Sequence, residues 1–232
     1  MLENNLSTRL DQSLDPPTLA SRAYQAIKLD ILNGRLEQGA KIVESDLALK
    51  YGISRGPLRE AIHRLEQMKL ILRGPHAGSR VVSLDMKMMQ DIYTAREPLE
   101  GMAARLAARL MSDEDIDDLF KLLDQQALGI DQSETSSYLQ SETDLDFHSR
   151  IVRASDNQWI LEKLNGELYQ LVRMCRRQFK PALEPALTTL NQHRQIANAI
   201  AAHDEELAEL LMRRHISSAW KDVQSIFEQK AD

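Results

Sequence analysis

Residues 37–82 decide the fold, and they read EQGAKIVESDLALKYGISRGPLREAIHRLEQMKLILRGPHAGSRVV. Their apolar spacing predicts helices over residues 44–50 and 55–68, separated by a tight turn in which Gly52 can adopt positive φ. Two short strands are expected over residues 70–72 and 80–83, joined by a Gly- and Pro-rich loop. Upstream, Thr18 is the expected N-cap of a helix over residues 19–32. Helix, turn, helix and hairpin in this order are typical of a winged helix-turn-helix.

Charge is distributed unevenly along the chain, which has 232 residues and a formal net charge of −6. Between residues 50 and 80 there are seven Lys or Arg and two acidic residues, whereas from residue 86 onward 17 basic residues accompany 25 acidic ones. A basic block attracts phosphates and an acidic block is repelled by them. The distribution therefore favours nucleic-acid binding by the N-terminal part of the chain.

Strand patterns end before residue 86, and the remaining sequence predicts only helices, over residues 86–111, 113–128, 135–154, 157–179, 184–202 and 204–229. Pro98 lies inside the first of these and should kink it. The expected fold class is mainly α, with a winged helix-turn-helix over residues 18–84 and a C-terminal antiparallel all-α helical bundle over residues 85–232. The polar residues 1–17 are expected to form a flexible N-terminal arm.

Composition excludes several classes of protein. No apolar run approaches the ~20 residues that span a membrane, and residues 1–17 lack the apolar core of a secretory signal. The single cysteine, Cys175, rules out an intrachain disulfide and a metal site with several cysteines. A reducing, cytoplasmic setting is therefore expected.

The helix that begins after Gly52 carries the candidate DNA-reading residues. Ser54 is positioned to cap it, and Pro57 falls in the first turn, where proline is tolerated. Arg55 and Arg59 are four residues apart, so they lie on one face near the N-terminal end, from which a recognition helix contacts base edges. The arginine fork suits guanine O6 and N7. The alternative is that both arginines are only solvated charges on an exposed helix face.

Residues 37–82 resemble the DNA-binding domain of the GntR family, whose pattern runs G-x-x-L-x-E-x-x-L-A, then G-V-S-R-x-P-V-R-E-A-L, then a wing that contains glycine. The matching positions are Gly39, Glu44, Leu47, Ala48, Gly52, Ser54, Arg55, Pro57, Arg59, Glu60 and Ala61. The resemblance implies base or phosphate contacts from Arg55 and Arg59, next to Ser54. It also implies minor-groove contacts from the wing near His76 and Gly78.

Four side chains of the C-terminal region form a candidate metal site. Asp144 and His148 are spaced i, i+4 and therefore project from one face of a predicted helix. His193 and His215 each accompany an apolar stripe that marks the inward face of a helix. Three imidazoles and one carboxylate can hold a divalent transition metal and leave positions open for water or an acid. Taken singly, His193 and His215 are more often hydrogen-bonded core residues, and Asp-x-x-x-His is more often a surface ion pair.

Residues 86–232 resemble the FCD effector domain of the FadR branch of this family, an antiparallel helical bundle. The matching positions are Asp144, Phe147 and His148 in D-x-x-F-H, His193 in H-R-x-I-x-x-A-I, His215 in M-x-x-H-I, and Arg96 in R-x-x-L-E. The resemblance implies a metal held by Asp144, His148, His193 and His215, with Zn, Ni and Mn all open.

Arg96 is the candidate effector-binding residue, because the family arginine at this position tends to face the ligand pocket. A guanidinium can clamp an effector carboxylate through two hydrogen bonds. The alternative for Arg96 is an ion pair with Glu100 or Asp91. Further along the chain, Arg176 and its arginine neighbours are expected in solvent, although one of them could line the pocket.

Together these features predict a metal- and carboxylate-responsive DNA-binding transcription regulator. We expect a homodimer that binds double-stranded operator DNA, because palindromic operators match a two-fold protein. A small organic acid would release it from a catabolic operon that it represses. The alternatives are a sensor of the metal itself and a metalloenzyme. Catalysis is disfavoured because no further general base is well placed. His203 or Asp146 would have to serve, and Asp146 points away from Asp144 on the same helix.

Overall fold

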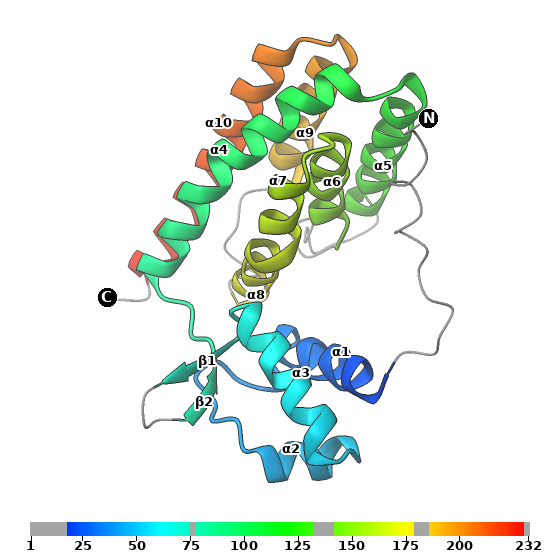
Figure 1. The fold of residues 1–232 in the computed structure, drawn as a ribbon. Coiled ribbons are helices and arrows are strands. Elements are labelled where there is room, and N and C mark those ends of the chain that lie inside the picture. Colours follow the sequence, from blue (N-terminus) through cyan, green and yellow to red (C-terminus); the bar gives the residue numbers. More distant parts are fainter. Residues whose placement is uncertain (1–17, 75–77, 132–141, 179–185, 230–232) are drawn as a thin grey trace, which may run out of the picture.

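The computed structural model describes residues 18–74, 78–131, 142–178 and 186–229, so the predicted N-terminal arm and His76 lie outside the described residues. It contains two parts, which we call the head and the bundle (Figure 1). The head comprises α1 (Leu19–Leu32), α2 (Glu44–Tyr51), α3 (Arg55–Gln67), β1 (Ile71–Gly74) and β2 (Gly78–Val81). The bundle comprises α4 (Met86–Leu110), α5 (Asp113–Asp131), α6 (Glu142–Ala154), α7 (Gln158–Lys163), the π-helical segment η2 (Leu164–Leu168), α8 (Tyr169–Gln178), α9 (Ala186–Ala201) and α10 (Glu205–Gln229).

Local sequence signals explain the helices of the head. The Thr18 hydroxyl accepts a hydrogen bond from the backbone N–H of Ser21, which confirms the predicted N-cap of α1. Gly52 ends α2 with φ of 63°, the left-handed conformation that glycine adopts without steric cost. The turn that follows lets α3 cross α2, and Leu58 and Leu65 on the inner face of α3 are fully buried. The predicted winged helix-turn-helix is therefore confirmed.

The wing is a two-stranded antiparallel sheet in which Ile71 pairs with Val81 and Gly74 pairs with Gly78. A bridge between Lys41 and Arg80 attaches the extended segment before α2 to the same sheet. The strands lie slightly closer to the loop than the predicted 70–72 and 80–83, since pairing continues up to the two glycines.

The bundle is built around the long helices α4 and α10, which lie side by side (Figure 1). Small residues allow this close approach: a Cβ placed on Gly101 of α4 would lie 2.7 Å from Cγ of Arg213 of α10. Pro98 lies inside α4, yet the helix continues from Met86 to Leu110, so the expected kink does not interrupt it. The side chain of Asp85 caps this helix by accepting from the N–H of Met88.

The single helix predicted over residues 157–179 is divided in the structure into α7, η2 and α8. The side chain of Asn157 caps α7, but a π-helical segment, η2, separates α7 from α8. A π-helical segment widens the helix locally, and such segments occur often at functional sites. Apolar periodicity averages over several turns, so the sequence pattern did not reveal this local change.

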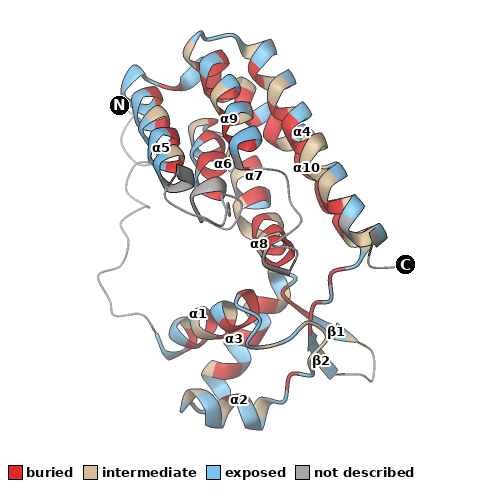
Figure 2. Ribbon diagram, turned by 180° about the vertical axis from the view of Figure 1, so that it is seen from behind, coloured by how far each residue is buried: buried red, intermediate tan, exposed pale blue. Residues whose placement is uncertain are grey.

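Buried residues lie along the inward faces of the helices in both parts (Figure 2). Helix α8 contacts α1 and so connects the bundle to the head. Among the described residues, none of the helices combines the length and the apolar character needed to cross a bilayer.

Candidate functional site

A buried carboxylate fixes the geometry of the head. Asp30, near the end of α1, is 5% exposed and accepts hydrogen bonds from Lys50 Nζ at 2.7 Å and from the Tyr51 hydroxyl at 2.8 Å. Arg35 adds a third contact at 3.1 Å. Burial alone would raise the pKa of Asp30, but the hydrogen bonds from Lys50 and Tyr51 outweigh it and hold the pKa below its usual value. Asp30 therefore ties the end of α2 to α1.

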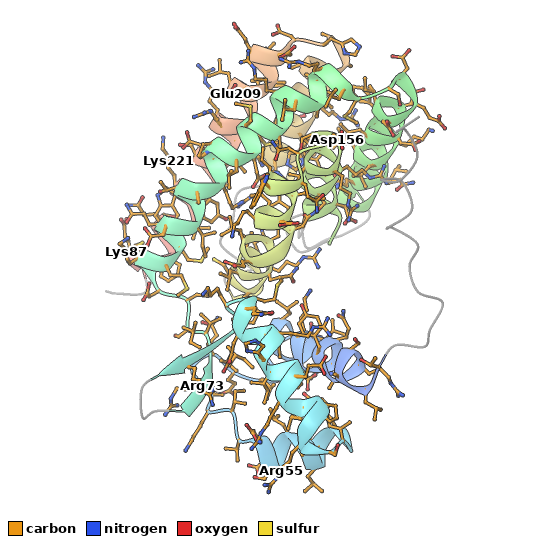
Figure 3. The ribbon with its side chains drawn as sticks, in the orientation of Figure 1. Arg55, Arg73, Lys87, Asp156, Glu209 and Lys221 are labelled. Atoms are coloured by element: carbon orange, nitrogen blue, oxygen red, sulfur yellow. The ribbon has the colours of Figure 1, made fainter. Side chains whose placement is uncertain are left out.

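The candidate DNA-reading residues lie at the N-terminal end of α3. Ser54, Arg55 and Arg59 are all exposed, and Arg55 lies at the end of the head farthest from the bundle (Figure 3). Ser54 occupies the N-cap position, but among the described residues its side chain makes no capping hydrogen bond, so the prediction that it caps α3 is wrong in this respect. Its hydroxyl is therefore not committed to the helix.

Arg59 has a partner that the sequence analysis missed. Its Nε donates to Glu44 Oε2 at 2.8 Å, and Glu44 is the first residue of α2. Both side chains are at least one-third exposed, so the ion pair contributes little to stability and mainly orients the guanidinium. Glu44 belongs to the same sequence motif, but it precedes Arg59 by 15 residues, and only the crossing of α2 and α3 brings them together.

The wing adds further exposed groups beside α3. Arg73 on β1 and Gly78 on β2 are exposed, and Arg73 extends from the wing in Figure 3. A groove of about 450 Å³ lies between α3 and the wing. Its lining residues are Ile42, Glu44, Arg59, Ile62, His63, Glu66, Arg73, Gly78 and Ser79. The arrangement offers an exposed helix end and a basic wing to the same partner.

Three histidines from three helices converge in the bundle. His148 of α6, His193 of α9 and His215 of α10 are at most 4% exposed. Nε2 of His215 lies 3.2 Å from Nε2 of His193 and 3.3 Å from Nε2 of His148. The ring of Phe147 stacks on His193 with centroids 4.0 Å apart. The structure thus brings together three of the four predicted metal ligands.

The fourth predicted ligand, Asp144, belongs to α6, but its side chain lies outside the described part of the chain. Its backbone position is one helical turn before His148.

The other ring nitrogens of two histidines have oxygen partners. Nδ1 of His148 lies 2.6 Å from Glu100 Oε2, a contact at ion-pair distance that lacks hydrogen-bond angles. Nδ1 of His215 lies 2.6 Å from Gln192 Oε1. Such distances favour the tautomer with the proton on Nδ1, because two bare acceptor atoms would repel each other. The Nε2 lone pairs of His148 and His215 then point toward the common centre.

The electrostatics of the site favour neutral imidazoles. Burial is the largest cause that holds the pKa of His193 and the pKa of His215 well below the usual histidine value, and the neighbouring histidines lower both further. Neutral imidazoles offer the lone pair that a metal requires. Buried nitrogens that face one another within 3.3 Å are stabilised by a cation between them. The donor set therefore fits a divalent transition metal.

Arg96 lies next to the three histidines. It forms an ion pair with Glu100, which was predicted as the alternative to effector binding. Its Nε donates to Glu100 Oε1 at 2.6 Å, and both side chains are fully buried. The guanidinium lies over the ring of Tyr93 at 4.8 Å and near that of Tyr169 at 5.7 Å. Asp91, the other candidate partner, instead pairs with Lys87.

The ion pair leaves most of the arginine fork available. Nη1 and Nη2 of Arg96 are buried and have no hydrogen-bond partner within the described ranges. Burial would lower the pKa of Arg96, but Glu100 raises it above its usual value. Burial would likewise raise the pKa of Glu100, but Arg96 and His148 outweigh it and hold the pKa well below its usual value. Both groups are therefore charged, and the two Nη atoms can bind an anion.

Helix α8 supplies two further buried residues, Tyr169 and Arg176, beside Arg96 and Glu100. The hydroxyl of Tyr169 is buried close to Glu100, and it makes no well-aligned hydrogen bond in the part of the chain that is described. Burial, followed by the charge of Glu100, raises its pKa well above the usual value. Arg176 is 7% exposed, so the expectation that it lies in solvent is wrong. The inward face of α8 could have shown this, since Val172 and Cys175 on it are also buried.

Comparison with known families gives two matches that together cover most of the chain. Residues 19–81 match the family described as bacterial regulatory proteins, gntR family. Residues 91–218 match the FCD domain. The first match contains α1 to β2, and the second contains the three histidines and Arg96.

Bacterial relatives are similar over most of their length. A probable D-xylose utilization operon transcriptional repressor of Paenarthrobacter nicotinovorans is 30% identical, with 87% of each chain covered. A gluconate operon transcriptional repressor of Bacillus licheniformis is 29% identical over 87% of this chain and 82% of its own. Among solved structures, Escherichia coli McbR/YncC has the same fold, with a TM-score of 0.71, 21% identity, and coverage of 93% of this chain and 99% of its own.

Proposed function

Because the chain belongs to the GntR family of bacterial transcription regulators, we propose that it represses an operon and that a small carboxylate, bound beside a divalent metal in the bundle, controls its operator affinity. The family and the relatives are regulators of transcription and not enzymes, as the sequence predicts. A regulator that binds operator DNA would act in the cytoplasm.

One observation carries the effector half of this proposal. Nη1 and Nη2 of Arg96 are fully buried and find no hydrogen-bond partner among the described side chains. Leaving a buried charged donor unpaired costs free energy, about 1–3 kcal/mol or more. A carboxylate that bound end-on to the two Nη atoms would remove this cost and would add two charge-assisted hydrogen bonds. This supports Arg96 as the effector clamp.

The candidate metal ligands are His148, His193 and His215, with Asp144 as the fourth. When bound, a divalent metal such as Zn, Ni or Mn supplies a positive charge and an open position for an acid oxygen. Glu100 connects the candidate metal ligands to Arg96, because it lies 2.6 Å from Nε of Arg96 and 2.6 Å from Nδ1 of His148. An anionic ligand would thus meet two centres of positive charge.

The operons named for two relatives suggest the chemical class of the effector acid. The two relatives described above regulate D-xylose utilization and gluconate operons. We therefore propose a sugar acid or another compact hydroxy acid as the effector. The buried hydroxyl of Tyr169 supports this class, because it can hydrogen bond to a ligand hydroxyl or carboxylate.

For DNA binding we propose that Arg55 and Arg59 contact base edges or phosphates in the major groove, with Ser54 beside them. His76 and Gly78 of the wing would contact the minor groove. A homodimer would place two such heads on a palindromic operator, with the interface supplied by the bundle.

The test is a titration of operator affinity by fluorescence anisotropy, using the promoter region adjacent to the gene and an unrelated duplex as control. Zn²⁺-loaded protein is titrated with D-gluconate, D-xylonate and citrate, and metal-free protein is titrated in parallel. We expect at least one acid to weaken operator binding in the metal-loaded protein only. A response to metal with no response to any acid would instead identify a metal sensor.

A further inference from the structure

Glu100 lies between the two halves of the ligand site. It belongs to α4, one turn after Arg96, and its side chain is fully buried. Each of its two carboxylate oxygens faces a different partner: Oε1 faces Nε of Arg96 and Oε2 faces Nδ1 of His148, both at 2.6 Å. No other described carboxylate contacts both the clamp and a metal-ligand candidate.

We propose that Glu100 is a positioning residue that holds the effector clamp and a metal ligand at the same time, and thereby couples acid binding to metal binding. The inference rests on the proposed function for the identity of the two ligands. The coupling itself follows from contacts among this chain's own side chains.

The first half of the role concerns His148. A carboxylate oxygen at Nδ1 selects the tautomer with the proton on Nδ1, so the lone pair is on Nε2, which faces His215. Partners of this kind orient a histidine and raise its basicity toward a metal. Without Glu100, His148 would be free to carry its proton on Nε2, and that nitrogen could not bind a metal.

The second half concerns Arg96. Because Glu100 contacts Nε, the guanidinium is held by its side edge, and the end with Nη1 and Nη2 is left for a ligand. An acid bound at that end would share the charge of Arg96 with Glu100. The carboxylate of Glu100 would then interact more strongly with His148, which would favour the metal. By linkage, the metal must favour the acid by the same factor.

Gln192 provides a matched control within the same site. Its Oε1 forms a hydrogen bond with Nδ1 of His215 at 2.6 Å, the same distance that separates Glu100 from His148, but no contact joins Gln192 to Arg96 in the described structure. Loss of Gln192 should weaken metal binding through His215 and leave the clamp unchanged. Loss of Glu100 should affect both.

The experiment compares the full-length wild type with Glu100→Gln and Gln192→Ala. Glutamine has one acceptor oxygen where glutamate has two, so it can serve Arg96 or His148 but not both. Nitrogen-15 NMR reports the tautomer of each histidine in metal-free protein, and the Nε–H signal of Arg96 reports its hydrogen bond. Zn²⁺ affinity is measured by competition with a chromophoric chelator.

In Glu100→Gln we expect the Nδ1–H form of His148 or the Arg96 Nε–H bond to be lost, and Zn²⁺ affinity to fall about 10-fold or more. Zn²⁺ should shift the Arg96 Nε–H signal in the wild type and in Gln192→Ala, but not in Glu100→Gln. The proposal is overturned if Glu100→Gln keeps both metal-free signals and wild-type Zn²⁺ affinity, or if Gln192→Ala abolishes the Zn²⁺-induced shift equally.

Zn²⁺ uptake by the wild type separates this inference from the proposed function. A wild type that takes up no Zn²⁺ contradicts the proposed function, whereas the metal-free tautomer and Arg96 signals still test Glu100. If Glu100→Gln does not fold, Glu100→Asp replaces it: the charge remains, but the shorter side chain should lose one of the two contacts. If Glu100→Asp keeps both contacts unchanged, the proposed positioning role of Glu100 is overturned.

Discussion

The head and the bundle hold their charged groups in opposite environments. Arg55 and Arg59 are exposed at the tip of α3, whereas Arg96 and Glu100 are fully buried in the bundle. An exposed arginine keeps its hydration and can meet a large polyanion, while a buried arginine with unpaired nitrogens is suited to a small ligand that it encloses. Arginines of one chain can therefore bind two different partners, and the burial of each arginine indicates which partner it binds.

The comparison also predicts that damage to one part spares the other. The contacts that fix the head, around Asp30, and those that fix the ligand site, around Glu100, share no residue. Variants in each part should therefore have separable effects.

The largest effect is expected for His193→Ala in the bundle. Loss of one of three converging imidazoles should lower Zn²⁺ affinity by more than about 100-fold, because loss of an outer partner alone typically costs 10–100-fold. Isothermal titration calorimetry measures the affinity, and anisotropy shows whether operator binding without acid is retained. His203→Ala is the matched control, since His203 is exposed and its ring contacts the carbonyl of Ala108 instead of the other histidines. A His193→Ala protein with wild-type Zn²⁺ affinity would remove His193 from the ligand set.

Next in size is Arg59→Ala in the head. A bidentate arginine contact is worth about 1–3 kcal/mol, so specific operator affinity should fall roughly 5- to 150-fold. Zn²⁺ binding and thermal stability should stay as in the wild type. Arg22→Ala removes an exposed arginine of α1 outside the proposed reading face and should have a much smaller effect. Equal losses in the two variants would mean that Arg59 acts only through general charge.

Arg96→Met tests whether the buried arginine serves the small ligand. In the wild type, an acid at 100 times its Kd should stabilise the protein by about 2.7 kcal/mol, a rise in Tm of roughly 5–10 °C. The variant should lose this rise in a thermal-shift assay and keep its operator affinity. Arg105→Met, on the same helix but paired with Glu209 near the surface, should retain the rise. A full Tm response in Arg96→Met would exclude the clamp.

The smallest effect concerns the pH stability of the head. The folded-state pKa of Asp30 lies below its unfolded value, so its contribution is present above about pH 4 and is lost as pH falls through the folded-state pKa. Asp30→Asn should therefore reduce stability by about 1–2 kcal/mol at pH 7 and approach the wild type near pH 2–3. Denaturant unfolding of both proteins at several pH values measures this. A stability difference that is the same at every pH would contradict the role of the ionised carboxylate.

Much of the fold could be predicted from the sequence because its signals are local. A helix cap such as Thr18 acts within a single turn, and this predicted cap is confirmed. Apolar spacing placed the ends of α1 at Leu19 and Leu32, where the structure has them. The π-helical segment η2 was missed, since it is a small change in helical period.

The sequence by itself determined the winged helix-turn-helix, the helical bundle and the residue types able to read DNA or hold a metal. It did so because periodicity, caps and i, i+4 spacing depend on residues within a few turns of one another. Only the tertiary structure decided which other distant side chains meet: Glu44 at Arg59, and Glu100 between Arg96 and His148. Such contacts depend on how separate helices pack, and residues far apart in the chain carry no local signal of it.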